Sequence, residues 1–79
     1  MGERLVNKLA NAFFAYINAD YSEYRIMRKE FTKALHKLNV YVNEKEDEQY
    51  TELVDVMYEF LYNEPLYVTD VIDRLSEFI

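Results

Sequence analysis

The sequence predicts an all-α protein, a compact four-helix domain in which residues 1–79 form a single unit and the helices are joined by short links. Three observations lead to this fold class. Apolar residues recur at intervals of three and four positions along most of the chain, as they do on helices that face a core. Glycine and proline, the usual residues of hairpin turns, occur only once each. Eight tyrosines and five phenylalanines provide the apolar area that a small domain needs to fold.

The first helix is expected over residues 3–18. Its apolar face is formed by Leu5, Val6, Leu9, Phe13, Tyr16 and Ile17. Phe14 lies beside this face, and a helix with so wide an apolar face usually packs against two elements rather than one. We therefore expect Phe14 to make a second packing contact. Asp20 and Glu23 then have the spacing of a capping box, which predicts a break before the next helix.

The second helix is expected over residues 22–38 and has the most regular amphipathic pattern in the chain. Its apolar stripe consists of Tyr24, Met27, Phe31, Ala34, Leu35 and Leu38. The opposite face carries five of the nine lysines and arginines. His36, the only histidine, lies among these lysines without a catalytic or metal-binding partner in the sequence, so we expect an ordinary exposed residue.

Part of the segment 19–31 resembles an EF-hand loop. The residues at the eighth and twelfth loop positions and the one that follows are Ile26, Glu30 and Phe31. The resemblance implies a short extended piece at 24–26 that pairs with another at 66–68. The chain departs from the EF-hand pattern at the first, third and sixth positions, which are occupied by Ala19, Tyr21 and Tyr24. We therefore expect neither a metal ion nor any other cofactor.

A short extended link is expected at 40–42, because Val and Tyr favour strands and the flanking Asn39 and Asn43 suit a helix C-cap and N-cap. The third helix is then expected over 44–62, with the acidic run that starts at Glu44 placed favourably at its N-terminus. Its apolar arc consists of Tyr50, Leu53, Val54, Met57, Phe60 and Leu61.

The third helix is expected to end before Pro65, because proline disfavours a helical conformation at the residue that precedes it. A second extended link at 66–68 then leads to the last helix, over 69–79, with Thr69 as its N-cap. Its apolar stripe is Val71, Ile72, Leu75, Phe78 and Ile79. A chain that ends on two large apolar residues predicts a C-terminus docked on the core.

The net charge of −6 is distributed unevenly along the chain. Residues 1–40 hold seven basic and four acidic side chains, a charge of +3, whereas residues 41–79 hold two basic and eleven acidic ones, a charge of −9. The overall charge disfavours direct binding to nucleic acid or to an anionic membrane, since both need clustered cations. There is no cysteine and no long apolar run, so we expect neither disulfides nor a membrane span, and a cytoplasmic location.

The third helix carries a second stripe that is acidic and lies about 160° from its apolar arc. Like charges at this spacing destabilise an isolated helix by about 0.2 to 0.5 kcal/mol per pair, and no lysine or arginine lies nearby on the helix to offset them. Either water and salt screen the stripe, or a basic surface lies opposite it. Two tyrosines beside the stripe favour recognition of a partner. The candidate partner-binding residues are Glu48, Glu52, Asp55, Tyr58, Glu59 and Tyr62.

The sequence contains no catalytic constellation, and a substrate cleft would consume most of the core of so small a domain. We therefore expect a protein that is not an enzyme and that acts by binding a protein target with a basic or mixed surface. By analogy of size and charge, it would be an inhibitor or modulator, such as an immunity-type or phage-borne host-modulating factor. Two alternatives remain: an obligate homo-oligomer, such as a homodimer, that pairs the basic second helix with the acidic third, and an acidic mimic of nucleic acid.

Overall fold

The computed structural model describes residues 2–63 and 68–78, and within these ranges the chain is all-α, with no β-strand. In chain order the elements are α1 (Gly2–Ile17), α2 (Tyr24–Lys45), the 3₁₀ turn η1 (Glu48–Tyr50), α3 (Thr51–Asn63) and α4 (Val68–Leu75). The expected all-α four-helix fold is confirmed. The molecule measures 37 × 22 × 20 Å.

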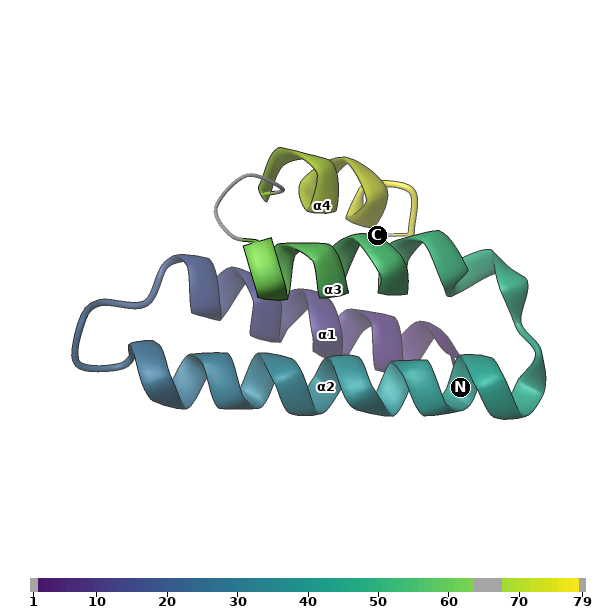
Figure 1. Ribbon diagram of the computed structural model, residues 1–79, viewed down its shortest axis with the longest axis horizontal. Coiled ribbons are helices and arrows are strands. Elements are labelled where there is room, and N and C mark those ends of the chain that lie inside the picture. Colours follow the sequence, from purple (N-terminus) through teal and green to yellow (C-terminus); the bar gives the residue numbers. More distant parts are fainter. Residues whose placement is uncertain (1, 64–67, 79) are drawn as a thin grey trace.

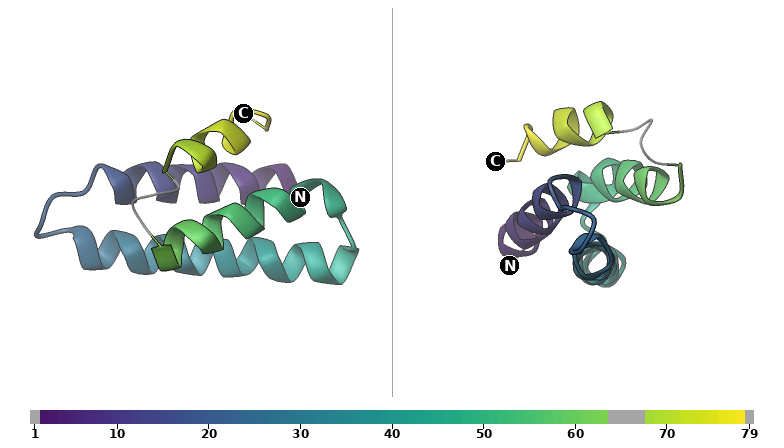
Figure 2. Two further views of the ribbon diagram at one scale, coloured as in Figure 1. Left: turned by 45° about the horizontal axis from the view of Figure 1, so that its top comes forward. Right: turned by 90° about the vertical axis from the view of Figure 1, so that its left-hand side faces the viewer.

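The long helices α1 and α2 form an antiparallel hairpin, α3 lies against this hairpin, and α4 packs on α3 (Figure 1). Seen along the long axis, α1, α2 and α3 surround the core, while α4 lies on the opposite side of the molecule from α2 (Figure 2). Opposite charges are therefore separated in space, because α2 carries six of the nine cations, whereas α3 and α4 together carry five carboxylates and a single cation.

Four aromatic rings from three helices form the centre of the core. Phe13 and Tyr16 of α1, Phe31 of α2 and Phe60 of α3 are all buried. Phe13 and Phe60 meet edge to face with their ring centroids 5.2 Å apart, and Tyr16 stacks on Phe31 at 5.6 Å. Such pairs add about 0.5 to 1.5 kcal/mol to the stabilisation that burial supplies. The hairpin and α3 are thus joined through a single cluster of rings.

The helical periodicity predicted the buried faces well. All six residues of the apolar arc expected on the third helix are buried, and Phe14 makes the expected second contact, edge to face with Phe13 at 5.4 Å. His36 is exposed, as expected. Tyr24 was expected on the apolar stripe of the second helix, but 41% of it is exposed. It is the first residue of α2, at the end of the hairpin that extends beyond α3 (Figure 1).

The prediction of extended pieces at 24–26 and 40–42 was wrong, because both segments are helical and belong to α2. Residues 24–26 form its first turn, so no EF-hand loop exists. At 40–42 the helix continues because Val42 is buried and Tyr41 packs against the core. This burial outweighs the strand preference of the two residue types. The extended link expected at 66–68 lies outside the described residues except for Val68, which begins α4.

Helix α2 ends at Lys45, with Glu46 rather than Asn39 as its C-cap, and Asn43 is an interior residue of α2 rather than an N-cap. Glu46 adopts the left-handed conformation, with φ 52°, and its N–H donates to the carbonyl of Val42. The amide of Asp47 donates to the same carbonyl at 3.2 Å. The acidic run therefore begins at the C-terminus of a helix, where the macrodipole disfavours negative charge. The predicted placement at a helix N-terminus was wrong for Glu44.

Replacing Glu46 with glycine is expected to stabilise the protein by about 1 kcal/mol. The change removes the steric cost of a left-handed side chain, about 1 to 2 kcal/mol, and a carboxylate from the C-terminus of α2, while glycine loses more entropy on folding. Urea unfolding measures the difference. The matched control is Glu44→Gly, which lies within α2 and should destabilise by about 1 kcal/mol. A loss of stability in both variants would contradict the left-handed turn.

The last two helices begin and end at different residues from those expected. Helix α3 starts at Thr51 rather than residue 44, because η1 and the turn at Glu46 precede it. Helix α4 ends at Leu75, and Thr69 lies inside it rather than at its N-cap. The ring of Phe78 packs against that of Tyr50, with centroids 5.2 Å apart. This contact confirms that the C-terminal segment is docked on the core.

Candidate protein-binding surface

An acidic groove of about 590 Å³ lies between α3 and α4. Its lining residues are Glu52, Asp55, Val56, Glu59, Asp70, Asp73, Arg74 and Glu77. Six carboxylates and one guanidinium give it a formal charge of −5, nearly the net charge of the whole protein. Three carboxylates were predicted from α3, whereas the two from α4 and that of Glu77, in the turn after α4, were not. We call this feature the acidic groove.

Both helices present their carboxylates to the acidic groove because their opposite faces are buried. Helix α3 buries Leu53, Met57 and Phe60, and α4 buries Val71 and Leu75. The three acids of α3 follow one another at intervals of three and four residues, as do Asp70, Asp73 and Glu77 in α4 and the turn after it, so each set shares one face. The same spacing at Asp70, Asp73 and Glu77 is visible in the sequence, and it could have predicted the side of the groove that faces α3.

Arg74 forms the only ion pairs among the described residues. Its Nη1 lies 2.8 Å from Oε2 of Glu52 and 3.7 Å from Oε1 of Glu77. All three side chains are largely exposed, and exposed pairs of this kind contribute about 0 to 1 kcal/mol. Asp55 and Asp73 have no cation within ion-pair distance in the described part of the chain. The acidic groove therefore retains most of its negative charge.

Tyr58 and Tyr62 lie at the border of the acidic groove rather than in it. Their rings stack with centroids 6.4 Å apart and planes inclined by 16°. Tyr58 is half-buried and packs on the core, whereas 75% of Tyr62 is exposed. Each tyrosine follows an acid of the groove, Asp55 or Glu59, by three residues, which places it about 60° further around α3. The half-buried ring of Tyr58 thus supports an exposed aromatic surface beside the carboxylates.

On the other side of this tyrosine pair, α2 approaches the end of α3. Nη2 of Arg28 donates a hydrogen bond of 3.1 Å to the carbonyl oxygen of Leu61, in the last turn of α3. A cation at this position satisfies an end carbonyl and interacts favourably with the helix dipole. A shallow hollow continues along α2 from this point, lined by Arg25, Arg28, Lys29, Thr32, Lys33 and His36. The last turn of α3, which includes Tyr62, is therefore in contact with the basic helix α2.

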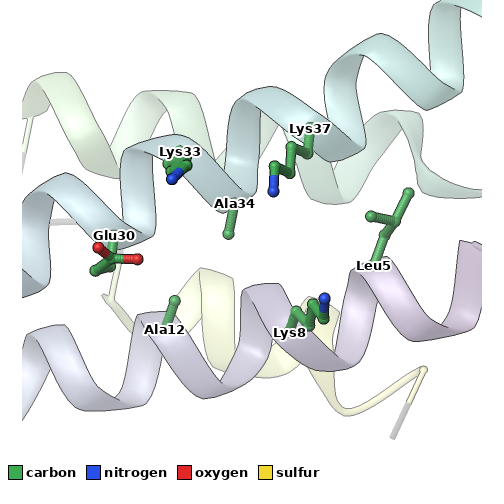
Figure 3. A pocket seen from close by; sticks show the side chains of 7 residues that line it. All are labelled: Leu5, Lys8, Ala12, Glu30, Lys33, Ala34 and Lys37. Carbon is green, nitrogen blue, oxygen red and sulfur yellow. The ribbon is translucent and has the colours of Figure 1, made fainter.

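A smaller hollow of about 230 Å³ separates α1 from α2 (Figure 3). Ala12 and Ala34 face each other across it, and Lys8 and Lys37 extend over it. Its other lining residues are Leu5, Glu30 and Lys33. The described residues contain no group of three or more acidic or histidine side chains able to hold a metal ion. None of the described helices is long and apolar enough to cross a membrane.

The three side chains with shifted pKa values, Asp20, Tyr41 and Tyr50, lie outside the candidate surface. Burial raises the pKa of Tyr41, and the hydrogen bond of 3.3 Å that its hydroxyl donates to Asp47 adds to the shift. Burial likewise raises the pKa of Tyr50. The pKa of Asp20 is lowered because its carboxylate accepts hydrogen bonds from the Ser22 hydroxyl and the Glu23 amide. The bond from the Glu23 amide to Asp20 belongs to the turn before α2, because Glu23 itself is the N-cap and no side-chain cap bond is formed, so the predicted capping box was wrong.

No known protein family, curated protein or solved structure matches this chain. Its function must therefore be argued from the arrangement of its own side chains. Of the six candidate residues, the structure brings Glu52, Asp55 and Glu59 together in the acidic groove and places Tyr58 and Tyr62 at its border. The sixth, Glu48, is exposed in η1 and does not line the groove.

Proposed function

We propose that this protein acts by binding a protein target, as an inhibitor or modulator, through the acidic groove and the adjacent tyrosine pair. The observation that carries the proposal is the stacked pair of Tyr58 and Tyr62, one exposed and the other packed on the core, beside six carboxylates. The target is expected to present a basic or mixed surface.

The chemistry of these side chains suits recognition of a protein. A tyrosine buries a large area while losing few rotamers and keeps a hydroxyl that can donate a hydrogen bond, so tyrosines are enriched among the residues that dominate binding energy. The carboxylates of the acidic groove, which the tyrosine pair borders, attract a basic partner over a longer range. The guanidinium of Arg28 favours a target that also carries acidic groups.

The first experiment recovers the target by affinity capture with the tagged protein and then measures binding by variants. Tyr62→Ala is expected to weaken binding by about 2 kcal/mol or more, mainly through faster dissociation. Asp55→Lys is expected chiefly to slow association, and added salt should reduce its effect. Tyr21→Ala, which removes a fully exposed tyrosine from the α1–α2 turn, is the matched control and should bind normally.

A mimic of nucleic acid would respond differently to the same variants. Its affinity would come from the summed negative charge, so Asp55→Lys would weaken binding strongly, Tyr62→Ala would bind normally, and duplex DNA would compete for the target. That pattern would refute the tyrosine anchor. Circular dichroism of each variant confirms that the fold is retained.

A further inference from the structure

The outward face of α2 is not covered by any of the other described helices, as Figure 2 shows. Its residues recur at intervals of three and four and are all exposed: Ile26, Lys29, Lys33, Lys37 and Val40. Ile26 is 60% exposed and Val40 is 38% exposed, so an apolar side chain lies at each end of three lysines. We call this stripe the outer face of α2.

None of the three lysines forms an ion pair within the described part of the chain, where both ion pairs involve Arg74. Glu30, one helical turn from Lys33 and two turns from Lys37, lines the hollow next to α1 together with both of them. Lysines one turn apart repel one another, as do the carboxylates of the acidic groove. Contact between the lysines of the outer face of α2 and the carboxylates of the acidic groove would offset the repulsion within each surface.

One molecule cannot make this contact with itself. Helices α2 and α4 lie on opposite sides of the molecule, with α3 and the core between them (Figure 2). A second copy can make it, because the spacing of the two charged rows agrees. Lys29 and Lys33 are one turn apart, about 6 Å along α2, and Asp55 and Glu59 are separated by the same rise along α3. Tyr62, at the border of the groove, offers an aromatic surface to the apolar ends of the lysine row.

We propose that the protein associates head to tail, with the outer face of α2 of one copy against the acidic groove of a second. The two surfaces differ, so the contact is heterologous, and it either extends through further copies or closes into a ring. Exposed ion pairs contribute little individually, so the association is reversible and weakens as salt rises. If the acidic groove also binds the proposed target, as the proposed function requires, target binding and self-association exclude each other.

Charge reversal tests the contact on both sides. The first variant is Lys29→Glu with Lys33→Glu, and the second is Asp55→Lys with Glu59→Lys. Sedimentation velocity at up to about 1 mM protein is run at ionic strengths of about 0.01 M and about 1 M, where the Debye length is about 30 Å and about 3 Å. The wild type should associate at low salt and dissociate at high salt. Each variant alone should stay monomeric, because residues 29 and 33 of one copy and residues 55 and 59 of the other then carry charges of the same sign.

An equal mixture of the two variants should associate again, because the glutamates at 29 and 33 of one variant now face the lysines at 55 and 59 of the other. The matched control, Arg4→Glu with Lys8→Glu, changes the charge equally on exposed residues of α1 and should associate like the wild type. A monomeric wild type at low salt, or a mixture that fails to associate, would overturn the proposal. Binding of the target through Tyr62 would be unaffected by that result, so the failure of one proposal is distinguishable from the failure of the other.

Discussion

Replacing Phe31 with alanine is expected to lower the free energy of unfolding by about 3 to 5 kcal/mol, the range found for large aromatic side chains in cores. The side chain is fully buried. Its ring lies 5.6 Å from Tyr16, 5.8 Å from Phe13 and 5.9 Å from Phe60, centroid to centroid. Truncation therefore leaves a cavity where three helices meet, and no single neighbour can move to fill it.

Urea unfolding followed by circular dichroism measures this effect. At about 0.05 to 0.15 kcal/mol per residue, a domain of this length has a stability of about 4 to 12 kcal/mol, so the change removes a large share of it. His36→Ala is the control, since it lies on the same helix and is exposed. It should change stability by no more than about 0.5 kcal/mol. Equal losses of stability in the two variants would mean that the buried and exposed faces of α2 are assigned wrongly.

Replacing Leu53 with alanine is the second change expected to have a large effect, a loss of about 2 to 5 kcal/mol. Leu53 is fully buried in the first part of α3. The loss combines the transfer free energy of the removed methyl groups with about 24 cal/mol for each Å³ of cavity that the neighbours leave unfilled. Thermal and urea unfolding should agree on the size of the loss if unfolding is two-state.

Tyr62→Ala is the control for this second change because it removes a larger side chain from the same helix. Most of that side chain is exposed, so its loss should cost no more than about 1.5 kcal/mol, the upper value for a stacked aromatic pair. If Tyr62→Ala destabilised the protein more than Leu53→Ala, the assignment of the buried and exposed faces of α3 would be reversed.

The buried faces could be predicted because a helix repeats every 3.6 residues, and the apolar side chains of this sequence follow that period closely. Phe31 and Leu53 lie at the centres of their stripes, and both are fully buried. Helix ends were predicted less well. The residues that end α2 include no glycine, and Glu46 takes the left-handed conformation in its place. The residue types at 40–42 favour a strand, yet this segment is helical. Val42 is buried and Tyr41 packs against the core, and this burial depends on the tertiary structure rather than on the local sequence.

Half of the acidic groove could be predicted from α3 alone. The other half comes from α4, whose acids Asp70 and Asp73 have an ordinary local explanation near the N-terminus of a helix. Their meeting with Glu52, Asp55 and Glu59 depends on how two helices pack, which the period of a single helix does not specify. The ion pair between Arg74 and Glu52 likewise joins residues from different helices.

In this fold, each helix packs mainly against the helix that precedes or follows it in the chain. Contacts between residues near in sequence close short loops and cost little chain entropy, and helical domains with such contacts fold within about microseconds to milliseconds. Three of the four central rings, those of Phe13, Tyr16 and Phe31, belong to the α1–α2 hairpin. During synthesis the hairpin can therefore assemble before Phe60 of α3 arrives.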